Sequence, residues 1–170
     1  MTIYVFGYGS LINMKKNKHQ IENPVVRKIC PVIVKDLKRY FNVLGNGNDR
    51  LLGVKDMPNS VSNGILYRVS EAELERLIER EKHYMPKILD RQRIMFSYNK
   101  TIPFTPADEI ICFYPQTKYT LTKKMAVTLP IRENYFPTCT EGAKKISKAF
   151  FEDFMQTTHW FWFCFHKIII

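Results

Sequence analysis

Short runs of β-branched and aromatic residues recur along the chain, as is typical of strands. Strands are predicted over residues 3–6, 25–34, 51–54, 64–69, 88–98 and 109–114. Turn-forming residues at 45–49 and 58–60 separate some of these runs. Helical spacing predicts one helix from 70 to about 83 and a second helical region over 134–158. Because strands outnumber helices and do not alternate strictly with them, we expect an α+β fold.

The two helical regions carry different internal signals. In the first, Ser70 followed three residues later by Glu73 has the pattern of a capping box. The second is expected to bend or break at Gly142, because glycine weakens a helix interior. One side of its later half is apolar: Ile146, Phe150, Phe154 and Met155.

A carboxylate interrupts the apolar side of the first helix. Leu74, Leu77 and Ile78 mark the side that faces the core, and Glu81 is the next position on that side. In one interpretation Glu81 turns out to water or pairs with an arginine at the helix end. In the other it is a general base that faces a cavity, with a pKa tuned by partial burial. Tyr84 is then expected to line the same cavity.

The first predicted strand runs directly into a loop with two glycines, formed by Gly7, Tyr8, Gly9, Ser10 and Leu11. Such a loop presents backbone N–H groups to a carboxylate or a phosphate. A dinucleotide-binding motif is excluded because Ile12 occupies the third glycine position. A nucleophile elbow around Ser10 fails because Gly9 directly precedes the serine and Ile12 replaces the last glycine.

Composition limits the number of domains and the kinds of partner that the chain can have. The 170 residues suit one domain over 1–160, with a strongly apolar tail over 161–170 of unknown role. The net charge of +10 fits a solvated basic surface that attracts anionic substrates, and its lysines and arginines are too dispersed for a nucleic-acid partner. The tail is too short to span a membrane, so it is expected to be buried in the same chain or across a homodimer.

Cysteine and histidine spacing points away from metal chemistry. The four cysteines form no C-x-x-C pair and the four histidines form no metal-binding pattern. We therefore expect no metal and no cofactor. Reduced thiols, together with the lack of a signal peptide, favour a cytoplasmic protein.

Three ordered segments resemble the γ-glutamylcyclotransferase-like superfamily, particularly its ChaC-type and bacterial members. Residues 8–11 are similar to the Y-G-S-[NL] signature, and 77–84 to the L-D-x-R-E-x-x-Y segment, with departures at Ile78 and His83. Residues 135–143 resemble the Y-x-x-x-C-x-x-G-A stretch, and 157–160 resemble the end of bacterial relatives. The resemblance implies a small mixed β-barrel with flanking helices.

The resemblance also implies an activity. Members of the superfamily cyclise a γ-glutamyl group to 5-oxoproline and release the attached amine or peptide. It implies that Glu81 is the catalytic acid/base, that the loop over 7–11 holds the substrate and that Tyr135 adds a hydrogen bond. Glutathione, γ-glutamyl amino acids and γ-glutamyl amines stay open as substrates. The alternatives are a non-catalytic protein that binds a γ-glutamyl ligand or a protein partner and, last, a nucleic-acid-binding module.

Overall fold

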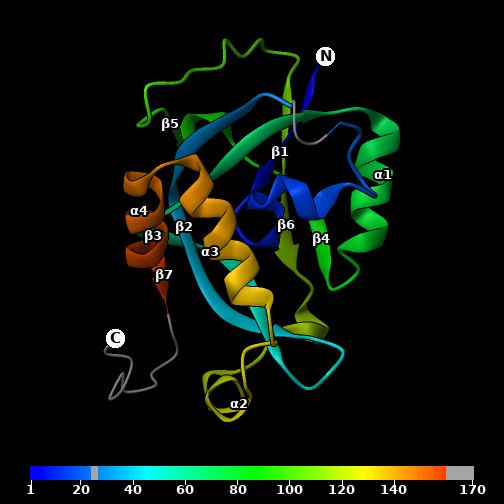
Figure 1. Ribbon diagram of the computed structural model, residues 1–170, viewed down its shortest axis with the longest axis vertical. Coiled ribbons are helices and arrows are strands. Elements are labelled where there is room, and N and C mark those ends of the chain that lie inside the picture. The colour runs from blue at the N-terminus through cyan, green and yellow to red at the C-terminus, as the bar shows by residue number, and fades with distance from the viewer. Residues whose placement is uncertain (24–26, 160–170) are drawn as a thin grey trace.

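A mixed, seven-stranded sheet and four α-helices make up the part of the chain that the computed structural model describes, residues 1–23 and 27–159 (Figure 1). The strands are β1 (Ile3–Gly7), β2 (Ile29–Leu44), β3 (Arg50–Val69), β4 (Tyr84–Ile88), β5 (Ile94–Met95), β6 (Glu109–Pro115) and β7 (Thr158–His159). The α-helices are α1 (Glu71–Arg80), α2 (Lys123–Thr128), α3 (Tyr135–Ile146) and α4 (Lys148–Thr157). Short 3₁₀ helices are η1 (Ser10–Ile12), η2 (Met14–Asn17), η3 (Arg91–Arg93) and η4 (Thr117–Tyr119). The predicted α+β class is confirmed.

The sheet places β1 at its centre. The strand order is β4-β6-β1-β3-β2-β5, and β7 adds to β2. β1 runs antiparallel to β3 and parallel to β6. Val5 and Phe6 in β1 are completely buried, as expected for a strand covered on both faces. The loop that follows β1 therefore starts from a rigid, buried support.

The expected closure into a barrel is not observed. The edge strands β4 and β5 form no pair with each other within the described residues, so the sheet stays open. The physical reason lies in β5, which has only two residues and pairs only with Ile33 and Val34 of β2. A strand this short cannot bridge the gap to the opposite edge.

Two long, bent strands replace several shorter predicted ones. Residues 51–54 and 64–69 both belong to β3, and the predicted turn at 58–60 lies inside it. There the register with β2 shifts, Asp36 and Asn59 adopt positive φ, and the Asp36 carboxylate accepts the Asn59 N–H at 2.9 Å. The turn residues thus form a bulge that bends the hairpin instead of ending a strand.

The other predicted strands agree in part. Residues 3–6 and 109–114 lie in β1 and β6 as expected. The run at 25–34 is the beginning of β2, with 25 and 26 outside the described residues. The predicted strand over 88–98 is confirmed only at Ile88, the end of β4, and at Ile94–Met95, which form β5. It is interrupted between them because Asp90 caps η3 through a 2.9 Å bond from the Gln92 N–H.

The helices differ from expectation at their ends. The capping box of α1 is present, but α1 ends at Arg80, because the chain turns at Glu81 towards β4. Leu77 is buried, whereas Ile78 is 40% exposed, so the predicted apolar side is wrong at that position. The second helical region breaks at Ser147 and not at Gly142. Ser147 is extended and its hydroxyl caps α4 by accepting the Phe150 N–H at 3.0 Å.

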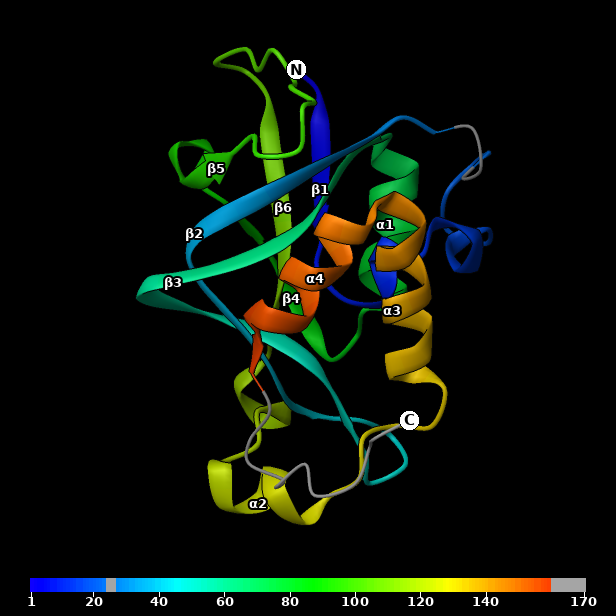
Figure 2. The same ribbon diagram turned by 60° about the vertical axis from the view of Figure 1, so that its left-hand side comes forward.

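The helices cover the sheet unevenly. α4 lies across β2 and β3 (Figure 2). Its Phe150 and Phe154 side chains are fully buried. α3 packs on α4 and on η1, directly after the glycine loop. α1 connects β3 to β4, and its last turn delivers Glu81 to the same region. The predicted tail over 161–170, and Trp160 before it, lie outside the described residues.

Candidate active site

The backbone of the loop after β1 passes very close to neighbouring atoms at its two glycines. A Cβ atom on Gly9 would lie 2.9 Å from the Tyr135 hydroxyl, and one on Gly7 would lie 3.0 Å from the Cβ of Leu11. Both contacts are closer than side chains normally allow, so glycine lets the backbone approach α3 and its own next turn. Gly9 then caps η1, and its carbonyl accepts the Ile12 N–H at 3.0 Å.

Glu81 occupies the C-cap of α1. Its N–H donates to the Leu77 carbonyl at 2.8 Å, and its carbonyl accepts the Tyr84 N–H at 2.8 Å. The backbone is therefore fixed on both sides, and the side chain is only 14% exposed. Burial raises the pKa of the Glu81 carboxyl, and the Arg80 guanidinium, 3.5 Å away, opposes this shift. A carboxyl whose pKa is raised in this way holds a proton more readily than an exposed carboxyl, as a general acid/base requires.

These two features meet at one small cavity of about 20 Å³. Its walls are Tyr8, Gly9, Ser10, Leu11, Leu52, Glu81, Tyr84, Phe113 and Tyr135. Of the eight site residues that the sequence predicted, Gly7 alone is not in these walls. The fold thus brings together residues separated by more than a hundred positions, and their chemical roles stay predictions.

Three tyrosines share the cavity walls with Glu81. Tyr8 donates to the Phe113 carbonyl at 2.6 Å, and Tyr84 donates to the Leu52 carbonyl at 2.7 Å. The Tyr135 hydroxyl forms backbone hydrogen bonds with Leu52 and Ser10. Burial raises the pKa of all three tyrosines well above the usual value, so they stay neutral and keep their protons.

Arg80 is a further residue of the site, and it was not predicted from the sequence. In the structure Arg80 donates to the Ser10 hydroxyl at 3.3 Å and to the Asn17 side-chain oxygen at 2.5 Å, besides its ion pair with Glu81. Asn17 in turn donates to the Leu11 carbonyl at 3.0 Å. Its position directly before Glu81 in the R-E segment was the available signal.

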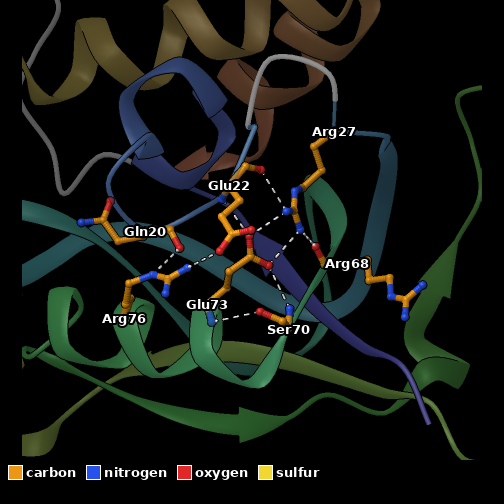
Figure 3. A network of polar contacts seen from close by, with 7 residues as sticks. All are labelled: Gln20, Glu22, Arg27, Arg68, Ser70, Glu73 and Arg76. Atoms are coloured by element: carbon orange, nitrogen blue, oxygen red, sulfur yellow. Dashed lines mark hydrogen bonds and ion pairs between the residues drawn. The ribbon is translucent and has the colours of Figure 1, made fainter.

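An ionic network around the buried carboxylate of Glu73 holds the other end of α1 (Figure 3). Glu73 completes the capping box with Ser70, accepts the Glu22 N–H at 2.8 Å and pairs with Arg27 at 2.6 Å. Burial acts to raise the pKa of Glu73, but these hydrogen bonds and Arg27 outweigh it and lower the pKa. The network ties the segment after η2 to α1, and so supports the helix that carries Glu81.

The described residues contain no group of three or more side chains arranged to hold a metal ion. They also contain no helix with the length and apolar character needed to cross a membrane. The groups gathered at the site are the Glu81 carboxylate with its Arg80 partner, the backbone of the glycine loop and neutral tyrosine hydroxyls. This set can hold an anionic group and transfer a proton.

Solved structures share the overall fold of the chain. The crystal structure of YkqA from Bacillus subtilis matches with a TM-score of 0.63 at 19% identity, covering 91% of this chain and 53% of that one. A structure described as a gamma-glutamyl cyclotransferase matches with a TM-score of 0.60 at 14% identity over 92% of this chain and 88% of that one. The chain has the γ-glutamylcyclotransferase-like fold.

A further structure with this fold is a γ-glutamyl cyclotransferase from yeast described as specific to glutathione. It matches with a TM-score of 0.58 at 14% identity, covering 93% of this chain and 97% of that one. The present chain spans about half the length of the Bacillus subtilis protein. No protein-family model matches the chain, and no curated protein matches its sequence. Likeness at this level of identity establishes the γ-glutamylcyclotransferase-like fold alone.

Proposed function

We propose that the protein is a γ-glutamylcyclotransferase, which converts a small γ-glutamyl compound into 5-oxoproline and a free amine or peptide. The observation that carries this proposal is the position of Glu81, whose buried carboxyl shares one cavity with the glycine loop and Tyr135. The fold supports the proposal, because structures described as γ-glutamyl cyclotransferases share it. Glutathione, γ-glutamyl amino acids and γ-glutamyl amines are the candidate substrates.

The reaction needs one base and no water. Glu81 takes a proton from the substrate α-ammonium, and the resulting amine attacks the γ-carbonyl carbon to form the new C–N bond. Glu81 then returns this proton to the amide nitrogen, whose bond to the γ-carbon breaks, and the extra proton on the new ring nitrogen passes to the released amine. Because the nucleophile and the carbonyl belong to one molecule, holding the folded-back conformer lowers the barrier by up to about 7–11 kcal/mol.

The remaining wall residues hold the charge that develops. Backbone N–H groups of the loop over 7–11 face the α-carboxylate or the oxyanion, as in other sites that stabilise anions without a metal. Tyr135 adds a hydroxyl donor, and Tyr84 lines the same cavity. The net charge of +10 favours encounters with an acidic substrate, which changes a rate and not the specificity.

The small volume of the cavity favours one alternative, a non-catalytic protein with the same fold. About 20 Å³ is close to the room that one water molecule requires, so a γ-glutamyl group enters only if wall side chains move outward. The bond from Arg80 to Ser10 is 3.3 Å long and therefore weak, which makes this pair the first contact expected to open. If the walls do not open, the protein is a non-catalytic member of the fold that binds a ligand or partner elsewhere.

The test is to incubate purified protein with glutathione, γ-glutamyl dipeptides and γ-glutamyl-lysine and to measure 5-oxoproline. We expect release with at least one substrate, and a loss of about 100-fold or more in Glu81→Gln, because general acid/base catalysis contributes that much. Glu79→Gln, an exposed carboxylate of the same helix, is the matched control and keeps its activity. Turnover in Glu81→Gln near that of the wild type contradicts the assignment. Binding without turnover across the panel selects the non-catalytic alternative.

A further inference from the structure

Arg39 is a cation in the interior of the protein. It lies in β2, has no exposed surface and forms no ion pair with a carboxylate in the described part of the chain. Its guanidinium instead donates six hydrogen bonds to neutral oxygens. The acceptors are the carbonyls of Tyr8, Asn63 and Phe154 and the side chains of Asn63, Thr157 and Thr158.

Most of these bonds stabilise the charge. The Phe154 and Thr158 acceptors belong to the C-terminal end of α4 and to β7, where the negative end of the helix dipole favours a cation. The Phe154 ring lies 4.0 Å from the guanidinium carbon and adds a cation–π contact. Burial lowers the pKa of Arg39 to about 9, so the group stays charged at neutral pH.

One bond leaves this cluster and reaches the candidate active site. Arg39 Nη1 donates to the Tyr8 carbonyl at 3.1 Å. The carbonyl of Tyr8 and the N–H of Gly9 belong to one planar trans peptide unit, in which they point in opposite directions. Fixing the carbonyl on Arg39 therefore fixes the direction of the Gly9 N–H, away from Arg39.

The Gly9 N–H is available to a ligand. Gly9 forms part of the cavity wall, and among the described residues no acceptor is hydrogen-bonded to its N–H. A hydrogen bond accepted by one end of an amide polarises the amide, which strengthens the donor at the other end. A charged donor such as Arg39 increases this effect.

We propose that Arg39 is a positioning residue, which orients the Tyr8–Gly9 peptide so that the Gly9 N–H presents a polarised donor to the oxyanion that develops on the γ-carbonyl oxygen of the substrate. The proposal rests on the proposed function for its kinetic consequence, but the orientation of the peptide is independent of it. Arg39 itself touches no substrate, because the Tyr8–Gly9 peptide lies between it and the cavity.

Arg39→Lys tests the proposal, since lysine keeps the charge and loses the planar set of donors. Thr157→Val is the matched control, because it removes one bond of the same guanidinium, 2.8 Å long, and leaves the bond to Tyr8 intact. In ¹⁵N–¹H spectra of the full chain, the Gly9 amide resonance should shift and its hydrogen exchange should accelerate in Arg39→Lys. Both should stay near the wild-type values in Thr157→Val.

The kinetic arm uses 5-oxoproline release. We expect kcat to fall about 100-fold in Arg39→Lys with a small change in KM, because loss of one oriented oxyanion donor costs that much, and to stay within about twofold in Thr157→Val. An unchanged Gly9 resonance in folded Arg39→Lys, or equal kinetic losses in both variants, overturns the proposal.

Two further outcomes are also decisive. A wild-type protein without turnover refutes the proposed function, and the spectra still decide whether Arg39 orients the peptide. If Arg39→Lys does not fold, Arg39→Gln takes its place, because its amide keeps a planar neutral donor. Failure of both variants to fold, measured by circular dichroism, means that Arg39 acts on the fold alone and overturns the proposal.

Discussion

Replacing Gly142 with alanine sets two physical effects against each other. Gly142 lies in the middle of α3, where alanine is favoured over glycine by about 1 kcal/mol of helix propensity. Its φ is not positive, so alanine can adopt its conformation. On propensity alone, Gly142→Ala therefore stabilises the protein.

Packing predicts the opposite sign. A Cβ on Gly142 would lie 2.8 Å from the backbone nitrogen of Asn13, 2.9 Å from its Cα and 3.0 Å from its Cβ. The Asn13 backbone cannot move away easily, because its N–H donates to the Ser10 carbonyl at 3.1 Å and its side chain donates to the Thr138 carbonyl at 3.1 Å. Inserting a methyl group against fixed backbone costs about 1–3 kcal/mol. Subtracting the propensity gain leaves an expected net destabilisation of up to about 2 kcal/mol.

Urea denaturation of the wild type and Gly142→Ala measures this difference. Glu141→Ala, an exposed neighbour in the same helix, is the control and should change stability by less than about 0.5 kcal/mol. An alanine at position 142 would push the Asn13 backbone away from α3. Because Asn13 directly follows η1, this shift would also reach the glycine loop, and 5-oxoproline release should fall. A Gly142→Ala protein more stable than the wild type would refute the packing argument.

Replacing two carboxylates, Glu81 and Glu73, is expected to change the stability of the protein in opposite directions. The folded-state pKa of Glu81 is raised by burial, so the unfolded chain releases that proton first and the wild type loses stability as pH rises above about 4.5. Glu81→Gln should remove this loss, and urea titrations from pH 4 to 8 should show the variant gaining stability relative to the wild type; a parallel profile contradicts the assignment. Glu73→Ala should cost about 3 kcal/mol in the same assay at pH 7, because it leaves Arg27 without its partner and the α1 cap incomplete. A loss below 1 kcal/mol would mean that the network of Figure 3 contributes little.

The features that the sequence predicted correctly are local. β1, the loop over 7–11 and the capping box at Ser70 each depend on residues within a few positions of one another. Propensity, glycine and capping chemistry determine such features without knowledge of the rest of the chain.

The features that the sequence missed depend on contacts between distant segments. Leu52 and Phe113 enter the cavity walls because β3 and β6 flank β1, and no local signal gives that strand order. The turn residues around Asn59 form a bulge because the Asp36 side chain receives the Asn59 N–H. Gly142 allows α3 to approach Asn13 closely and does not bend the helix. The residues around position 142 cannot show this, because Asn13 lies far away in the sequence.

The central place of β1 has a consequence for the order in which the chain folds. Its neighbours β3 and β6 follow much later, and the Tyr8 hydroxyl meets the Phe113 carbonyl 105 positions away. Closing such long loops is slow, so contacts of this kind place the protein among slowly folding topologies. During synthesis the apolar residues of β1 stay uncovered until β6 has been made, and for that period the nascent chain is exposed to aggregation.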